Sequence, residues 1–318
     1  MPEPPHPRGA TTPEMSRPLR VGVQLPEVER RVEWPELLTM ARTAEDVGLD
    51  SLWLGDHLLY DLPGGVTRGP WEVWTSLAAF AVVTSRVELG PFVASTGFHA
   101  PAMLAKMAAT VDGISEGRLV LGLGAGWNER EYTAFGFPFD HRISRFEEAF
   151  TVIRALVRDG RVDFHGTYYD VTDCVLDPPP TRPGGPPVML GSTGPRMMRI
   201  ALPHVDLWNA WWSDYANSPA EFADLRALLE AAASDEGRAP GEVGATAAVF
   251  VQFSEGAGRV MGDSSYNANV SPVPGDAAAI AEHLRAMADA GAVHVQLVLD
   301  PITVDTIRIA GRAVALVD

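Results

Sequence analysis

Residues 21–54 read VGVQLPEVERRVEWPELLTMARTAEDVGLDSLWL, and they predict one complete unit of strand, helix and strand. Val21–Leu25 is a short apolar run, and Ser51–Leu54 is a second one. Between them Pro35 suits the first turn of a helix, and apolar residues then recur at helical spacing as far as Val47. Two strands connected by a helix form the repeating unit of α/β proteins.

The same alternation continues along the rest of the chain. Further strands are expected at Val87–Ala94, Arg118–Leu123, Val188–Leu190, Val205–Asn209, Ala245–Phe253 and Val293–Leu299. Further helices are expected at Trp71–Val83, Pro101–Val111, Ile143–Val157, from about Pro195, and at Pro219–Ala233, Asp276–Ala290 and Thr303–Leu316. Eight strands, each followed by a helix, predict an α/β fold of the (β/α)8 TIM-barrel type, and mostly apolar strands fit a sheet covered on both faces.

Three segments depart from this alternation. Residues 162–187 are rich in β-formers, glycine and proline, and they predict an insertion between strands four and five, made of a short hairpin and a rigid connector. Residues 255–274 form a long segment without periodicity and predict a mobile loop. Residues 1–17 are polar and rich in proline, and they predict a disordered extension before a single barrel domain at 18–318.

Composition narrows the classes of function. The chain has 318 residues, 46% of them hydrophobic, and a formal net charge of −16, which argues against nucleic-acid binding. It contains no apolar run of about 18 residues, so no membrane-spanning helix is expected, and the lack of an apolar segment near the start favours a cytoplasmic protein. Cys174 is the only cysteine, and no metal-ligand spacing of His and Cys occurs, so no disulfide or metal site is expected.

In a barrel, functional residues lie at the carboxyl ends of the strands. Asp56 and His57 directly follow the second strand. Histidine titrates near neutral pH and can donate or accept a proton, so His57 is a candidate catalytic residue, and Asp56 either orients it or lines the same pocket. A purely structural turn is the alternative.

Two glycine-rich segments follow later strands. The run Gly122–Gly126 lacks the last glycine of a dinucleotide fingerprint, because Trp127 stands there. Glycines at this place let the backbone approach a flat ligand, although a tight turn would need them as well. The run Gly191–Gly194 comes just before a helix, and its backbone N–H groups suit a phosphate, with an ordinary helix cap as the alternative.

Several aromatic residues fall at or near predicted strand ends, where they could wall an apolar pocket. The expected substrate pocket consists of Gln24, Trp127, Trp208 and Trp211.

The run from Leu119 to Tyr132, with Phe135–Pro138 and Arg145–Ala149 behind it, resembles the luciferase-like monooxygenase superfamily. Within that superfamily the chain is most similar to the oxidoreductases that depend on the deazaflavin coenzyme F420, and Ser51–His57 supports this. The resemblance extends over about residues 19–312.

The resemblance implies a flavin or deazaflavin ring in the barrel mouth, partly covered by the insertion. It implies that His57 lies beside the reactive ring with Asp56 next to it, and that a non-proline cis peptide bond joins Phe92 to Val93 behind the ring. The implied cofactor-binding residues are Asp56, His57, Phe92, Val93, Ala125, Gly126, Gly191, Ser192, Thr193 and Gly194.

The chain departs from the sugar-phosphate dehydrogenases of this family. Those enzymes carry Glu at the position of Trp127 and Trp at the position of Asp61, and their basic phosphate-binding set has no counterpart here, because Lys106 is the only lysine. A more apolar or aromatic substrate is therefore expected.

The resemblance implies an F420-dependent oxidoreductase that transfers a hydride between deazaflavin and a small organic substrate. An FMN-dependent two-component monooxygenase, supplied with reduced flavin by a separate reductase, is one alternative. A non-catalytic binding protein on the same barrel is another. Family members are commonly dimers, so a homodimer is expected.

Overall fold

The structure is a computed structural model that describes residues 19–259 and 270–317. The predicted extension at 1–17 and the central part of the predicted loop at 255–274 lie outside these residues. The strands of the main sheet are β1 (Arg20–Gln24), β2 (Ser51–Leu54), β5 (Glu88–Pro91), β6 (Ala94–Ser95), β7 (Leu121–Gly124), β10 (Val188–Leu190), β11 (Leu207–Ala210), β12 (Gly244–Gln252) and β14 (His294–Asp300), with β13 (Val273–Pro274) beside β12.

The main sheet closes into a barrel. Its strands follow the order β5-β2-β1-β14-β12-β11-β10-β7-β6, and each neighbouring pair is parallel. The predicted third strand is split into β5 and β6 by a cis peptide bond between Phe92 and Val93, which is the non-proline cis bond that the resemblance implies. The two ends of this order are β5 and β6, which follow each other in the chain. Leu89 on β5 bridges to Leu119 just before β7, and β6 pairs with β7, so the barrel closes along β7. The TIM-barrel prediction is confirmed.

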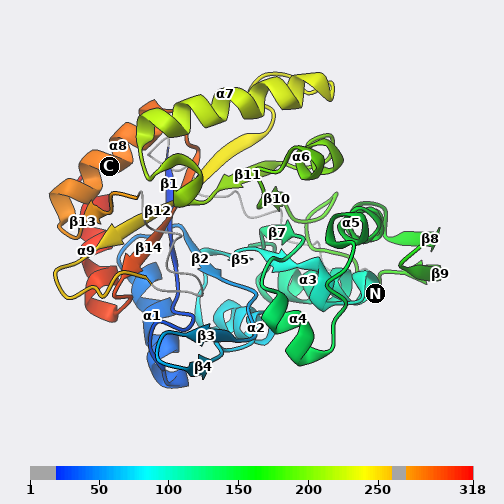
Figure 1. Cartoon of the computed structure of the whole chain (residues 1–318), viewed down its shortest axis with the longest axis horizontal. Helices are drawn as coiled ribbons and strands as arrows, with labels where there is room; N and C mark the ends of the chain where they lie inside the picture. The colour runs from blue at the N-terminus through cyan, green and yellow to red at the C-terminus, as the bar shows by residue number, and fades with distance from the viewer. Residues whose placement is uncertain (1–18, 260–269, 318) are drawn as a thin grey trace, which may run out of the picture.

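Helices form a ring outside the strands (Figure 1). They are α1 (Trp34–Asp46), α2 (Val73–Val83), α3 (Pro101–Ile114), α5 (Arg142–Asp159), α6 (Pro195–Ala201), α7 (Pro219–Asp235), α8 (Ala277–Asp289) and α9 (Val304–Val314). Proline occupies the first turn of α1, α3, α6 and α7, where a missing N–H costs nothing. Strands such as β2, β7, β10 and β11 are buried at every residue, so the core lies both inside the barrel and between strands and helices.

Short elements after the strands were not predicted. A hairpin of β3 (Tyr60–Leu62) and β4 (Val66–Arg68) follows β2, and helix α4 (Glu129–Phe135) follows β7. Single 3-10 turns, η1 (Thr96–Phe98) and η2 (Trp212–Tyr215), follow β6 and β11. Elements this short show little periodicity, yet all of them lie at the end of the barrel where the strands finish.

The insertion forms the predicted hairpin, β8 (Arg161–His165) and β9 (Asp170–Val175), but it does not cover the barrel mouth. The hairpin lies beyond α5 at the edge of the molecule (Figure 1). The carboxylate of Glu148 on α5 accepts the backbone N–H groups of Thr167, Tyr168 and Tyr169, at 2.8, 2.8 and 3.1 Å. The expected cover is a wrong prediction, because these bonds hold the hairpin tip along α5.

Arg118 ties together the amino-terminal end of the barrel. Its guanidinium donates hydrogen bonds to the carbonyl oxygens of Ala81, Val87 and Ser115, each at 2.8 Å, and to two oxygens of Thr84 at 3.0 and 3.1 Å. The planar fork of one side chain therefore connects the ends of α2 and α3 to the start of β5.

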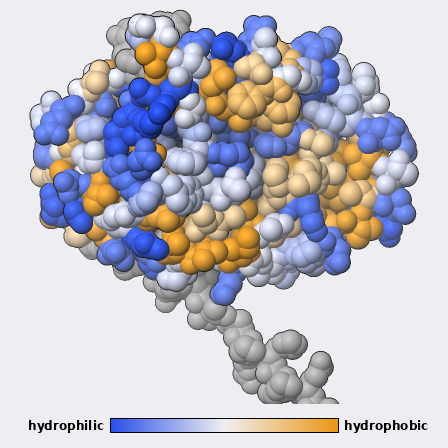
Figure 2. Space-filling model, turned by 90° about the horizontal axis from the view of Figure 1, so that it is seen from below, coloured by the Kyte–Doolittle hydropathy of each residue, from blue (hydrophilic) through white to orange (hydrophobic). Residues whose placement is uncertain are grey.

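The surface mixes hydrophilic and apolar side chains, and Figure 2 shows apolar patches among hydrophilic ones on one face. Large apolar side chains that are exposed include Val66, Trp71, Val82, Met103 and Phe135. Among the described residues, no helix combines the length and apolar character needed to cross a bilayer.

Candidate active site

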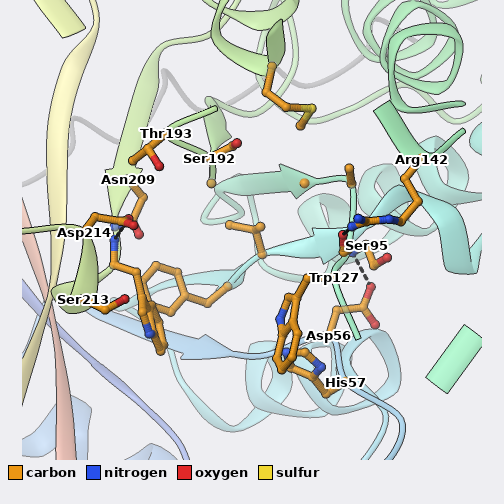
Figure 3. Close-up of a pocket in the computed structure, with 18 of the residues that line it drawn as sticks. Asp56, His57, Ser95, Trp127, Arg142, Ser192, Thr193, Asn209, Ser213 and Asp214 are labelled. Carbon is orange, nitrogen blue, oxygen red and sulfur yellow. Dashed lines mark hydrogen bonds between the residues drawn. The ribbon is translucent and has the colours of Figure 1, made fainter. Parts of the chain in front are cut away.

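A cavity of about 400 Å³ opens at the carboxyl ends of β2, β6, β7, β10 and β11. Figure 3 shows side chains from several strand ends converging on it. The predicted site residues that line it are Asp56, His57, Phe92, Val93, Ala125, Gly126, Trp127, Gly191, Ser192, Thr193 and Trp211. One cavity thus brings together residues from segments that are far apart in the sequence.

Three predicted residues do not line this cavity. Gln24 is fully buried, where it hydrogen-bonds to the carboxylate of Glu27 and accepts from Arg259 at 3.1 Å. Trp208 is also buried, and its indole N–H supports the loop after β10 by donating to the carbonyl of Ser192 at 2.9 Å. Gly194 caps α6 instead of facing the cavity. Gln24 and Trp208 therefore stand behind the pocket wall, which corrects their assignment to the substrate pocket.

The cavity also has polar residues that the sequence reasoning missed. They include Glu27, Ser95, Glu131, Arg142, Asn209, Ser213, Asp214 and Arg259. A signal existed for Glu131, because it stands three residues after Asn128 and just before apolar residues, a spacing typical of a helix start. No comparable signal marks Arg142 or Arg259.

Glu131 fixes the ring of His57. Its carboxylate lies 3.0 and 3.2 Å from Nδ1 of His57, and one of its oxygens accepts the backbone N–H groups of Leu58 and Leu59 at 2.6 and 3.1 Å. The Glu131 side chain is 1% exposed, so water does not compete for these bonds. A carboxylate opposite Nδ1 places a proton on that nitrogen, which leaves Nε2 available to a ligand.

The surrounding charges favour the protonated form of His57. Burial alone would lower the pKa of His57, but the hydrogen bond that its Nδ1 donates to Glu131 and the negative charges of Glu27, Glu131 and Asp56 outweigh it, and the net pKa is raised. The pKa of Glu27 is also raised by burial, although the nearby Arg259 guanidinium opposes that effect. Arg259 itself lies 3.4 Å from Glu27 and 3.0 Å from Glu29.

Of the two expectations for Asp56, it lines the cavity, and its hydrogen bonds go to residues other than His57. One oxygen of its carboxylate accepts the backbone N–H of Ser95 at 2.8 Å and lies 3.4 Å from Nε2 of His99 (Figure 3). Asp56 therefore holds β6, just after the cis bond, while Glu131 holds His57.

Three of the residues that line the cavity are glycines with crowded surroundings: Gly124, Gly126 and Gly191. A Cβ atom at Gly124 would lie 2.9 Å from a methyl carbon of Val93, and one at Gly191 would lie 2.7 Å from it. Gly126 has a φ of +71°, and a Cβ there would lie 2.1 Å from the hydroxyl of Tyr132. The strand ends approach so closely only because these positions are glycine.

Tyr132 on α4 supports this glycine-lined part of the cavity. Its hydroxyl donates to the carbonyl of Ala125 at 2.8 Å and lies 2.7 Å from Oγ of Ser95. Burial raises the pKa of Tyr132 to about 12, so the phenol stays a neutral donor at ordinary pH.

The two ends of the cavity differ in chemistry. At one end stand the hydroxyl groups of Ser192 and Thr193, and Arg142 lines the cavity as well, with its guanidinium bonded to the carbonyl of Gly126 (Figure 3). The other end is aromatic: the ring of Trp127 lies 5.7 Å from that of His57 and 6.1 Å from that of Tyr60. Trp211 and Trp212 also line the cavity, with their ring centres 4.0 Å apart and the rings tilted by 30°.

Comparisons with known proteins agree with this architecture. The family model described as luciferase-like monooxygenase matches residues 18–261. A phthiodiolone/phenolphthiodiolone dimycocerosates ketoreductase of Mycobacterium tuberculosis is 32% identical over 213 residues, which are 61% of this chain and 55% of that protein. An F420-dependent glucose-6-phosphate dehydrogenase of Amycolatopsis mediterranei is 36% identical over 172 residues, which are 52% of this chain and 50% of that protein.

The chain spans about half the length of the curated relatives that it matches. Among solved structures, an F420-dependent secondary alcohol dehydrogenase in complex with an F420-acetone adduct superimposes with a TM-score of 0.78 at 19% identity, covering 96% of this chain and 100% of that one. That likeness shows the shared fold. Since the family model covers most of the barrel, the chain belongs to the luciferase-like monooxygenase family.

Proposed function

We propose that the protein is an F420-dependent oxidoreductase that transfers a hydride between deazaflavin and a small apolar or aromatic organic molecule. The observation that carries this proposal is the pair of His57 and the buried Glu131 at a cavity that glycines also line. Reduction of a carbonyl, or oxidation of an alcohol, needs a proton donor or acceptor next to the carbon that exchanges the hydride.

The residues present fit such a cofactor. Gly124, Gly126 and Gly191 line the cavity and add no side chain to it, which suits the close approach of a flat ring. The hydroxyl groups of Ser192 and Thr193 suit a phosphate, and the apolar and aromatic walls keep water from the ring.

When bound, the deazaflavin supplies or takes up the hydride at a ring carbon. His57 holds a proton on Nε2 for a substrate oxygen, or accepts one in the reverse direction, and Glu131 stabilises the imidazolium through Nδ1. Asp56 fixes the backbone of Ser95, and Tyr132 fixes that of Ala125, so this part of the cavity keeps its shape during turnover.

The charges of the cavity favour a substrate without a phosphate. Arg142 and Arg259 are its only basic lining residues among those described, apart from His57. Arg259 is engaged by Glu27 and Glu29, and Arg142 is bonded to the carbonyl of Gly126. Trp127 and the pair of Trp211 and Trp212 instead present aromatic surface to a substrate.

An FMN-dependent monooxygenase supplied by a separate reductase is the second candidate. It has support from a pyrimidine monooxygenase of Cronobacter sakazakii that is 36% identical over 172 residues, 52% of this chain and 50% of that protein. A non-catalytic binding protein is a weaker candidate, because it would have no use for a buried carboxylate that orients His57. We also propose a homodimer, which light scattering on the purified protein would test.

The decisive experiment is a titration of the purified protein with F420 and with FMN, followed by ring fluorescence. Binding of F420 in preference to FMN is expected, and tight binding of FMN with none of F420 would overturn the proposal. A His57→Ala variant should retain most of the affinity for F420 and lose about 10²–10⁴-fold in turnover, the usual contribution of a general acid or base. An unchanged rate would exclude His57 from proton transfer.

A further inference from the structure

A second cavity, of about 310 Å³, adjoins the first. It is lined by Phe139, His141, Arg142, Ile143, Ser144 and Arg196. Arg142 and Ile143 line both cavities, so the two spaces meet at the start of α5. Arg196 stands three residues beyond Thr193, which lines the first cavity, so the second cavity continues outward from the hydroxyl-bearing end of the first.

The lining of the second cavity is basic. Two arginines and one histidine line it, and among the described residues no aspartate or glutamate does. Two acidic residues that do not line the cavity contact these cations: Glu147 lies 3.0 Å from Arg196, and Asp140 lies 3.8 Å from His141. In a chain with a formal net charge of −16, such a concentration of cations favours an anionic ligand.

The cations are held in place by packing. The guanidinium of Arg142 lies 4.3 Å from the centre of the Phe139 ring, and Arg196 donates to Oγ of Ser144 at 2.9 Å. His141 stacks at 5.7 Å against Tyr168 at the tip of the insertion hairpin. The hairpin that fails to cover the first cavity therefore forms part of the support of the second.

We propose that the second cavity is an anion subsite that holds a carboxylate-bearing arm of the cofactor beyond its phosphate. The inference rests on the proposed function and extends it to a separate group of residues. F420 continues past its phosphate into a chain of glutamates, whereas FMN ends at the phosphate. A ligand with its phosphate at Ser192 and Thr193 has its next anionic groups within reach of Arg196 and His141. The subsite then favours F420 over FMN by charge, independently of the ring.

The test compares three ligands by fluorescence titration: F420 with its glutamates, F420 from which the glutamates have been removed, and FMN. The wild-type protein should bind complete F420 about 3–10-fold more tightly than the trimmed form, the range expected of partly exposed ion pairs. This advantage should shrink as salt rises, because salt screens exposed charges. An Arg196→Gln variant should lose the advantage and leave the affinities for trimmed F420 and FMN unchanged.

Arg199→Gln is the matched control, because Arg199 is exposed on the same helix and does not line the second cavity. It should bind complete F420 as the wild-type protein does. Equal wild-type affinities for complete and trimmed F420 would overturn the subsite and leave the proposed function standing. An equal loss of affinity for FMN in Arg196→Gln would also overturn it, because the arginine would then hold the phosphate. Failure of both forms of F420 to bind would overturn the proposed function itself.

Discussion

Glu131 shows how one residue sets the chemistry of another that is far away in the sequence. It stands 74 positions from His57, yet it touches the imidazole and two backbone N–H groups beside it. Its hydrogen bonds all go to His57 and to the backbone beside it, so we regard Glu131 as a residue that positions His57. Its negative charge keeps a proton on Nδ1 and raises the affinity of Nε2 for a second one.

Replacing Glu131 by Gln should lower the pKa of His57, because the variant keeps an oxygen for the backbone N–H groups but removes the charge. The limb of the pH–rate profile that reports His57 should move to lower pH, and turnover should fall by about 10–100-fold, as for residues that orient a catalytic group. Glu129→Gln, on the exposed side of the same helix, is the control. A profile that does not move would show that Glu131 has only a structural role.

His283 on α8 should make the protein sensitive to acid. Burial lowers its pKa from 6.5 to about 4, and its buried Nε2 atom has no hydrogen-bond partner within residues 19–259 and 270–317. The unfolded chain therefore binds the proton more tightly, so stability should fall as pH drops through 6.5 and level off below about 4. The difference of 2.5 units corresponds to at most about 3 kcal/mol.

A His283→Leu variant should lose this part of the acid sensitivity. Urea unfolding at several pH values between neutral and acid would measure it, as the change in the free energy of unfolding relative to the wild-type protein. The free energy of unfolding should depend on pH in nearly the same way for both proteins near neutral pH. As the pH falls from 6.5 toward 4, the wild-type protein should lose more stability than the variant. Parallel stability curves over the whole range would exclude His283 as the source.

At the scale of elements, helix α4 joins the glycine-lined part of the cavity to the pair of His57 and Glu131. It begins three residues after Gly126, carries Glu131 toward His57, and carries Tyr132 back toward Ala125. Gly126 and the carboxylate that contacts His57 therefore belong to one continuous segment, and a change in the turn that connects them should disturb both.

Gly126→Ala tests this connection. The residue has a φ of +71°, and an added methyl group would meet Tyr132 and Ser95, so we expect a loss of roughly 2 kcal/mol or more in stability and weaker F420 binding. Gly136→Ala is a matched control, since Gly136 has a φ of +80° with nothing within 4 Å of the added atom. The control substitution should lose only the stability that a left-handed backbone conformation costs an alanine. Equal effects of the two substitutions would show that the contacts around Gly126 are unimportant.

The barrel elements were predictable because their signals are local. Each strand of the barrel is a short apolar run, and each outer helix repeats apolar residues at helical spacing, so the predicted bounds at Ser51–Leu54 and Val188–Leu190 agree with β2 and β10. The strand predicted at Val87–Ala94 was right in place, and the resemblance located the cis bond that divides it.

The candidate site was only partly predictable. His57 and the glycines that line the cavity follow strands directly, so their place in the chain indicates their place in the barrel. The spacing from Asn128 marks Glu131 as part of a helix start, but no local pattern shows that it reaches His57, and none marks Arg259. Trp208 illustrates the opposite error: it stands at a strand end, but the alternation of side chains along β11 turns Trp208 away and Asn209 into the cavity.

At the scale of the whole molecule, the two ends of the barrel have separate tasks. The carboxyl ends of the strands carry the cavities, whereas Arg118 binds several backbone carbonyls at the amino-terminal end. Residues at that end should affect stability and leave the site unchanged.

Arg118→Ala should therefore lower the free energy of unfolding by about 3 kcal/mol, because several carbonyl oxygens would lose their donor. Arg118→Lys should recover little of this loss, since an ammonium group cannot reproduce the planar fork. Urea unfolding gives the stability, and F420 titration at 25 °C should show an unchanged affinity. Arg308→Ala removes an exposed pair with Asp305 and should cost less than about 1 kcal/mol. A weakened affinity for F420 in Arg118→Ala would show that the two ends are coupled.

The place of Trp127 at the cavity mouth has an optical consequence. Trp127 is 47% exposed, and its ring lies 5.7 Å from that of His57. A chromophore bound in the cavity would therefore lie close to this fluorescent side chain. Energy transfer from this indole to a bound deazaflavin would quench part of the tryptophan fluorescence. A Trp127→Phe variant would lose the part of the quenching that is due to Trp127 and keep the part that is due to Trp211 and Trp212. The protein thus carries its own label for following ligand arrival in real time.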